Sequence, residues 1–206
     1  MNPTRLPSHP DRRQLVMACL AVASGLGLSA CDPNKPQFVS IDITGADYAR
    51  GFRLPDQNGQ VRTLEEFKGK VVAVFFGYTQ CPDVCPTTLT EWVEIKRQLG
   101  PEGDRLQGIF ITVDPARDTP EVLKAYMGNF DPSFLALIPE NPEALAQVAR
   151  EFKIIYKRVD GKTPGSYTMD HSAGSYLFDP QGRLRLYSRY GNRMDGLVSD
   201  IRWLLK

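Results

Sequence analysis

Two cysteines, Cys81 and Cys85, stand four positions apart in FFGYTQCPDVCPTTLTEW (residues 75–92), where an apolar run gives way to a helical pattern. At that spacing two thiols can form a disulfide, act as a redox couple or bind a metal ion. Both lie between a predicted strand and a predicted helix, where α/β sheets place ligands and helix N-terminal amides favour anions. We therefore expect thiolates of lowered pKa, with Pro86 as the first helical residue.

The C-x-x-x-C spacing favours a metal ion without excluding a disulfide. Residues four apart on a regular helix have Cβ atoms ~5–6 Å apart, whereas a relaxed disulfide requires about 3.5–4.5 Å. A metal ion with metal–sulfur bonds of roughly 2.3 Å bridges sulfurs that are too far apart for an S–S bond. The extra residue relative to the C-x-x-C of thioredoxins thus shifts the balance towards a metal site.

A third ligand is available in His171, within YTMDHSAGSYLF (residues 167–178). It is the only histidine outside the predicted signal segment, and it stands just before a predicted strand. In thioredoxin-like folds the loop before that strand, usually marked by a cis-proline, faces the cysteine loop. No proline stands between Asp170 and Tyr176 here. We expect His171 to be a metal ligand rather than a surface histidine, and Asp170 to be a candidate for orienting its ring.

Two thiolates and one imidazole form a soft ligand set that suits Cu(I) and can take Cu(II) if a fourth ligand joins. A structural zinc ion would need four ligands, for which Asp83, Asp114 and Asp170 are the further candidates. The cysteines are too few for an iron–sulfur cluster. Asp114 follows a predicted strand beside the site and is a second candidate for supporting the ligands. Its alternative role is to cap a turn, with Arg117 and Asp118 as solvated charges.

The surrounding pattern predicts a thioredoxin-like α/β fold, a mixed sheet with helices on both faces. Continuous apolar runs predict buried strands, a cap residue followed by proline predicts a helix start, and turn clusters between alternating residues predict hairpins. The predicted elements are a hairpin around residues 55–59, strands at 71–76 and 106–113 joined by a helix, helices capped by Thr119 and Asn141 with a short strand between them, a hairpin around 179–182, and a C-terminal helix.

The first thirty residues resemble an export signal. Arg12 and Arg13 precede LVMACLAVASGLGLSA (residues 15–30), a run shorter than the roughly 20 residues of a transmembrane helix. The run ends at Leu-Ser-Ala before Cys31, which resembles the lipobox of bacterial lipoproteins, and the arginine pair also resembles a twin-arginine signal. We predict a signal peptide at residues 1–30, a lipidated N-terminus and tether at 31–48, and a copper-binding domain at 49–206.

Processing of this kind leaves Cys81 and Cys85 as the remaining thiols, because Cys19 is removed and Cys31 carries lipid. They would then lie in a compartment where disulfides persist. The composition, with 42% hydrophobic residues in 206, is ordinary for one globular domain. A formal net charge of +1 provides no electrostatic footprint for nucleic acid, so we expect no nucleic-acid partner.

Three stretches resemble, in order, the signature sequences of the Sco/SenC family, the copper-binding assembly proteins of cytochrome c oxidase. They are FFGYTQCPDVCPTTL (75–89), VDPARDTP (113–120) and YTMDHSAGSYLFD (167–179). The resemblance extends from about Gly51 to Leu205. It implies a thioredoxin fold, membrane tethering, and one copper ion held by the residues that match the family ligands, Cys81, Cys85 and His171.

The resemblance also implies a role at the binuclear copper centre of cytochrome c oxidase subunit II. As a chaperone the protein would accept copper from a periplasmic donor and pass it on by ligand exchange. As a reductase it would reduce the recipient's cysteines through Cys81 and Cys85. The expected location is the periplasmic side of the inner membrane, anchored by Cys31, and we expect a monomer. In the family an acid matching Asp114 is thought to influence metal loading or redox behaviour.

Other functional classes fit the sequence less well. A membrane-tethered thiol–disulfide oxidoreductase is the main alternative, but the C-x-x-x-C spacing and His171 in place of proline disfavour it. A peroxiredoxin would show P-x-x-x-T-x-x-C, whereas Thr79 and Cys81 are separated by one residue and no proline precedes them. A copper or redox sensor would use the same ligands, so the sequence leaves that class open.

Overall fold

The apolar run that begins at Val71 forms β4 (Val71–Gly77), and every residue of this strand is buried. The structure is a computed structural model that describes residues 36–206, so the predicted signal peptide and Cys31 lie outside the described residues. β4 is an inner strand of a six-stranded sheet of order β1-β10-β9-β4-β5-β6. It pairs in parallel with β5 (Leu106–Thr112) and antiparallel with β9 (Ser175–Phe178). Its complete burial fits the continuous apolar run from which a strand covered on both faces was predicted.

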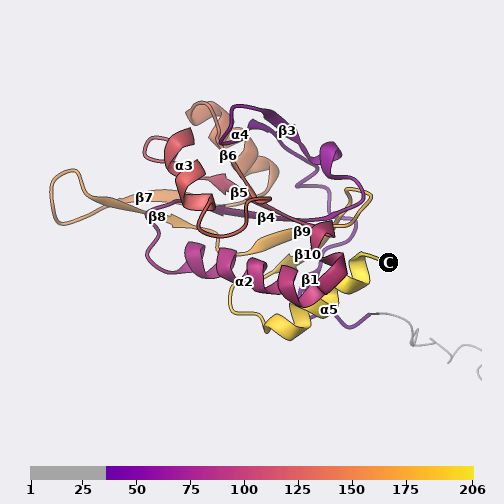
Figure 1. Ribbon diagram of the computed structural model, residues 1–206. Helices are drawn as coiled ribbons and strands as arrows, with labels where there is room; N and C mark the ends of the chain where they lie inside the picture. The colour runs from indigo at the N-terminus through magenta and orange to yellow at the C-terminus, as the bar shows by residue number, and fades with distance from the viewer. Residues whose placement is uncertain (1–35) are drawn as a thin grey trace, which may run out of the picture. The chain divides into compact units, whose positions relative to one another are not determined.

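The other strands extend this mixed sheet or form separate hairpins. The large sheet also contains β1 (Ile41–Asp42), β6 (Leu135–Leu137) and β10 (Leu184–Ser188). The predicted hairpins are confirmed as β2 (Arg53–Pro55) with β3 (Val61–Thr63), and β9 with β10. A further hairpin, β7 (Tyr156–Asp160) with β8 (Tyr167–His171), was not predicted. It extends away from the large sheet (Figure 1).

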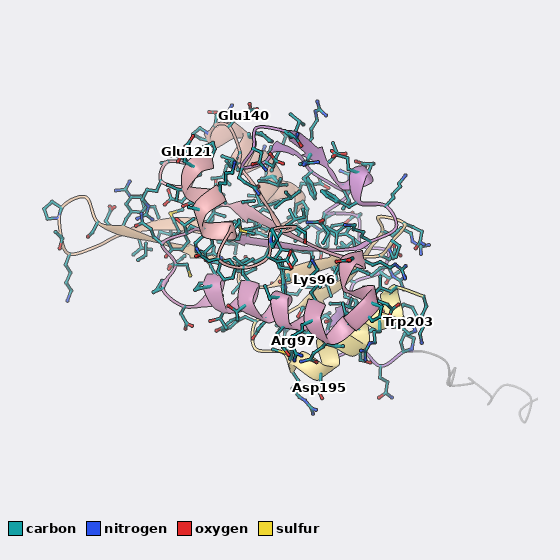
Figure 2. The ribbon with its side chains drawn as sticks, in the orientation of Figure 1. Lys96, Arg97, Glu121, Glu140, Asp195 and Trp203 are labelled. Carbon is teal, nitrogen blue, oxygen red and sulfur yellow. The ribbon has the colours of Figure 1, made fainter. Side chains whose placement is uncertain are left out.

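Four α-helices among the described residues cover the sheet, and the predicted fold class is confirmed. They are α2 (Val84–Leu99), α3 (Pro120–Met127), α4 (Pro142–Glu151) and α5 (Met194–Leu204). Helices α2 and α5 lie on one side of the sheet, with α3 and α4 on the other (Figure 1). Figure 2 shows Arg97 of α2 and Asp195 of α5 on the same side, opposite Glu121 of α3. Within residues 36–206 no helix is both long and apolar enough to cross a membrane.

Local sequence explains where these helices begin. The side chains of Thr119 and Asn141 accept hydrogen bonds from the backbone of the first turns of α3 and α4, and a proline follows each cap, as predicted. The predicted start of α2 was wrong, because the helix begins at Val84 and not at Pro86. Pro86 is tolerated in the first turn, since a backbone N–H there would have no helical partner.

Part of the segment that the sequence assigns to the tether packs on the domain. β1 pairs antiparallel with β10, and the rings of Phe38 and Trp203 meet edge to face with centroids 5.0 Å apart. The buried carboxylate of Asp200 accepts hydrogen bonds from the backbone of Val39 at 3.2 Å and of Ser40 at 3.0 Å. The chain therefore contributes to the folded unit from at least Phe38 onwards.

Candidate metal centre

The two cysteines lie where β4 ends and α2 begins. Cys81 is half-buried in the connecting loop, and its backbone N–H donates to the carbonyl of Tyr78 at 3.2 Å. Cys85 is in the first turn of α2 and is fully buried. The sulfur atoms of both cysteines and a ring nitrogen of His171 lie within 4.8 Å of one another. The three residues singled out by the sequence are therefore brought together, at the carboxyl end of β4.

His171 is the last residue of β8, not part of a loop as the sequence predicted. Its Nε2 lies 3.6 Å from the Cys85 Sγ. Its Nδ1 lies 3.1 Å from the carbonyl oxygen of Ser172. Because a carbonyl can only accept, Nδ1 carries the proton, and the lone pair of Nε2 is directed at the cysteines. This is the tautomer that a metal ligand requires.

Two aromatic rings contact the imidazole of His171 and partly shield it from water. The rings of Phe75 and Tyr78 each meet the ring of His171 edge to face, with centroids 5.9 Å away in both cases. Burial of the ring lowers the pKa of His171, and the Ser172 carbonyl and the charge of Asp170 oppose this only in part. The imidazole is consequently neutral at pH 7 and available as a ligand.

The expectation of lowered thiol pKa values is wrong for Cys85. Burial raises the pKa of its thiol well above the usual value, despite a backbone hydrogen bond from Tyr78 and a place at the start of α2. Loss of solvation outweighs the helix terminus because the sulfur is covered on all sides. In the metal-free, reduced protein Cys85 is therefore a thiol, and a cation must displace its proton in order to bind.

The acidic candidates take different places. Asp114 accepts hydrogen bonds from the hydroxyl of Tyr167 at 2.9 Å and from Arg117 Nε, so it supports the hairpin β7–β8. Asp170 is exposed and adds only its charge to the surroundings of His171. Asp83 is exposed at the N-cap of α2. Among the described residues, no carboxylate joins the cysteines and the histidine in the one cluster that could hold a metal ion. The site thus lacks the fourth ligand of a structural zinc.

Asp118, a solvated charge under the alternative interpretation of VDPARDTP, is fully buried beneath the cysteine loop. Its carboxylate accepts hydrogen bonds from the Thr79 hydroxyl at 2.6 Å, the Thr79 backbone at 3.1 Å and the Thr112 hydroxyl at 2.6 Å. It thereby ties the residue two positions before Cys81 to the end of β5. The sequence held one signal of this role, the predicted buried strand before VDPARDTP. A strand there places the residues that follow it at the same edge of the sheet as the cysteines.

Gly77 is the last residue of β4 and lies next to the buried sulfur of Cys85. A Cβ at this position would lie 2.7 Å from the Cys85 Sγ and 2.7 Å from a ring carbon of Phe110. We expect Gly77→Ala to lower the free energy of unfolding by about 1–3 kcal/mol through overpacking and to displace the Cys85 sulfur. Denaturant unfolding measures the first effect and the rate of thiol alkylation the second. Gly51→Ala is the matched control, because its Cβ would meet only Leu64 at 3.9 Å.

A family model described as SCO1/SenC matches residues 42–206 of the chain. Among curated proteins, the SCO2-like protein of Rickettsia felis is 39% identical over 159 residues, which cover 76% of this chain and 77% of that protein. Among solved structures, copper-bound ScoI of Bradyrhizobium japonicum is 41% identical, with a TM-score of 0.67 and coverage of 75% of this chain and 97% of that chain. Copper-bound yeast Sco1 is 32% identical, with a TM-score of 0.67 and coverage of 74% and 85%.

Proposed function

Because the chain belongs to the SCO1/SenC family, we propose that it binds one copper ion through Cys81, Cys85 and His171 and serves the assembly of cytochrome c oxidase. The observation that carries the proposal is the approach of two sulfurs and one imidazole nitrogen to within 4.8 Å of one another. Two relatives of 41% and 32% identity have been solved with copper bound. The donor set is soft, which suits Cu(I), and can accept Cu(II) with one further ligand.

The burial of the three ligands suits capture followed by release. Cys85 is fully buried, whereas Cys81 and His171 are half-buried. Three ligands leave a coordination position open, and the exposed side of Cys81 is where a donor or recipient thiolate can enter. Copper would pass by exchange of ligands, one at a time, to subunit II of the oxidase. A periplasmic donor would load the site by the same route in reverse.

The test of copper binding is a titration of the reduced, full-length protein with Cu(I) against a competing chelator. We expect one copper per chain and at least about tenfold weaker binding in His171→Ala. Loss of a residue that only orients a metal ligand costs about 10–100-fold in affinity, and His171 is a proposed ligand itself. Thr168→Ala is the control, since Thr168 is exposed on the same strand. Absence of stoichiometric binding in the wild-type protein, or equal affinity in His171→Ala, would refute the proposal.

A second function is favoured by the unequal exposure of the two sulfurs. Half-buried Cys81 can attack a recipient disulfide as thiolate, which forms a mixed disulfide and releases one recipient thiolate. The thiol of buried Cys85 passes its proton to a released recipient thiolate and attacks the Cys81 sulfur, which releases the second recipient thiolate and leaves a Cys81–Cys85 disulfide, so two electrons pass to the recipient. Whether this reductase activity accompanies copper transfer is decided by assaying a disulfide-bonded subunit II with copper-free protein.

We place the protein on the periplasmic side of the inner membrane, anchored through lipid on Cys31 and acting as a monomer. The support for export and anchoring is the sequence of residues 15–31, in which small residues directly precede Cys31. Mass spectrometry of the membrane-extracted protein tests this arrangement. We expect an N-terminus at Cys31 with the mass of acyl chains, and a Cys31→Ser variant that no longer sediments with membranes.

A further inference from the structure

Arg117 lies between the two segments that carry the proposed ligands. It belongs to the loop between β5 and α3, and only 19% of its side chain is exposed. Its Nη1 donates to the side-chain oxygen of Gln80 at 2.9 Å, immediately before Cys81, and to the carbonyl of Tyr167 at 3.0 Å. One guanidinium group therefore contacts both the cysteine loop and the hairpin β7–β8.

On the hairpin, Arg117 stacks on the ring of Tyr167, whose hydroxyl is hydrogen-bonded to Asp114. The Cζ of Arg117 lies 3.5 Å from the ring centroid of Tyr167, and the Cζ of Arg158 lies 3.9 Å from the same centroid. The Tyr167 hydroxyl donates to one carboxylate oxygen of Asp114, and Arg117 Nε donates to the other. Arg117, Asp114 and Tyr167 thus form a closed set of contacts. A planar guanidinium can donate and stack at the same time, which lysine cannot reproduce.

Tyr167 and His171 are the first and last residues of β8, and both face the body of the protein. Alternate residues of a strand share a face, and Tyr167, Met169 and His171 are half-buried whereas Thr168 and Asp170 are exposed. A two-stranded hairpin is at best marginally stable alone, so its position depends on contacts with the rest of the protein. Figure 1 shows that β7–β8 reaches well beyond the large sheet. Holding Tyr167 in place therefore restrains the strand that carries His171.

We propose that Arg117 is a positioning residue for copper binding, which joins the cysteine loop to the hairpin β7–β8 and so fixes the place of His171 relative to Cys81 and Cys85. The inference rests on the proposed copper function and assigns a role to a residue outside the ligand set. Arg117 acts through Gln80 on one side and through Tyr167 on the other.

The first measurement compares copper affinity in the full-length protein with and without this guanidinium. We expect Arg117→Ala to weaken Cu(I) binding by about 10–100-fold, the usual effect of losing a group that orients a metal ligand. Arg117→Lys keeps the positive charge but lacks the planar set of N–H donors, so it should recover only part of the lost Cu(I) affinity. Arg158→Ala is the matched control, because Arg158 stacks on the same ring but its side chain hydrogen-bonds only to Asp160 among the described residues. It should change affinity by less than about twofold.

A double-mutant cycle separates positioning of His171 from a general structural role. If Arg117 acts through His171, then Arg117→Ala should change affinity by less than about twofold in a protein that already carries His171→Ala. An equal loss in both backgrounds would overturn the proposal, as would unchanged affinity in Arg117→Ala. Either of those results would leave the copper function itself intact, because wild-type binding is measured in the same series.

Amide hydrogen exchange in the metal-free protein gives a readout that does not depend on copper. We expect Arg117→Ala to accelerate exchange of amides in β7 and β8 by at least about tenfold, with β4 and β5 unchanged. Unchanged exchange in the hairpin would overturn the inference. Faster exchange throughout the sheet would mean general destabilisation and would overturn it as well. If the wild-type protein bound no copper, this arm would still decide whether Arg117 holds the hairpin.

Discussion

Replacing Cys85 with serine is expected to remove tight copper binding, with a loss of affinity greater than about 100-fold. The loss of a group that merely supports a ligand costs about 10–100-fold, and here the ligand itself is lost. Serine has nearly the same shape, but its hydroxyl is a hard donor and does not ionise in this buried place. Competition titration of the reduced, full-length protein with Cu(I) measures the change.

Proton release checks the same prediction independently. Because burial raises the pKa of the Cys85 thiol, this group is protonated in the metal-free protein at neutral pH. Copper must displace that proton, so apparent affinity should rise by about tenfold per pH unit for each proton released. The Cys85→Ser variant should release one proton fewer. Tight binding by Cys85→Ser, or equal proton release by both proteins, would contradict a role of Cys85 as ligand.

Replacing Asp118 with alanine is expected to cost about 3 kcal/mol of unfolding free energy. Asp118 is fully buried, and its removal leaves the Thr79 hydroxyl, the Thr79 backbone N–H and the Thr112 hydroxyl without their acceptor. Each buried polar group left unsatisfied costs roughly 1–3 kcal/mol, although relaxation recovers part of the sum. Denaturant unfolding of the reduced, metal-free protein measures the loss. Asp195→Ala is the control, because Asp195 is an exposed partner of Arg193 and its removal should leave the free energy of unfolding nearly unchanged.

The pH dependence of Asp118→Asn tests the state of the same carboxyl group. Burial raises the pKa of Asp118 by more than the hydrogen bonds from Thr112 and Thr79 lower it. A folded-state pKa above the unfolded value of about 3.9 contributes stability that is complete below that value and is lost as pH rises through the folded pKa. Asparagine cannot ionise, so the stability deficit of Asp118→Asn should shrink as pH rises above about 4 and through the raised folded-state pKa of Asp118. A deficit that grew with pH would show that ionised Asp118 is the stabilising form.

The order and type of most elements were predictable because they rest on local signals. The run that begins at Val71 is apolar throughout, so the strand must be covered on both faces. Thr119 and Asn141 each accept a hydrogen bond from a backbone N–H three residues further along the chain, in the first turn of the helix that each one caps. The hairpin β7–β8 was missed because YKRVD is exposed along almost its whole length and YTMDH places only Tyr167, Met169 and His171 on a half-buried face, so neither strand shows the apolar run of a core strand. Its strands are defined by pairing with each other, such as Tyr156 with His171, rather than by a buried pattern.

The ligand set was predictable from residue type alone, whereas the state of the ligands was not. Two cysteines and one histidine define a soft donor set wherever the chain brings them together. The thiol of Cys85 has a raised pKa because the packing around it excludes water, and no feature of C-x-x-x-C reports that packing. The tautomer of His171 likewise depends on the Ser172 carbonyl, which lies beside Nδ1 only because of the backbone conformation at Ser172.

By itself, the sequence determined which atoms are available for chemistry, the order of most strands and helices, and the family resemblance that links Cys81, Cys85 and His171. Only the tertiary structure decided which sulfur is buried and which residues hold the site in place. Asp118 meets Thr79 across 39 residues of chain, and Arg117 meets Tyr167 across 50. Their hydrogen bonds require a particular approach of distant segments, which packing of the whole sheet creates and local propensity does not encode.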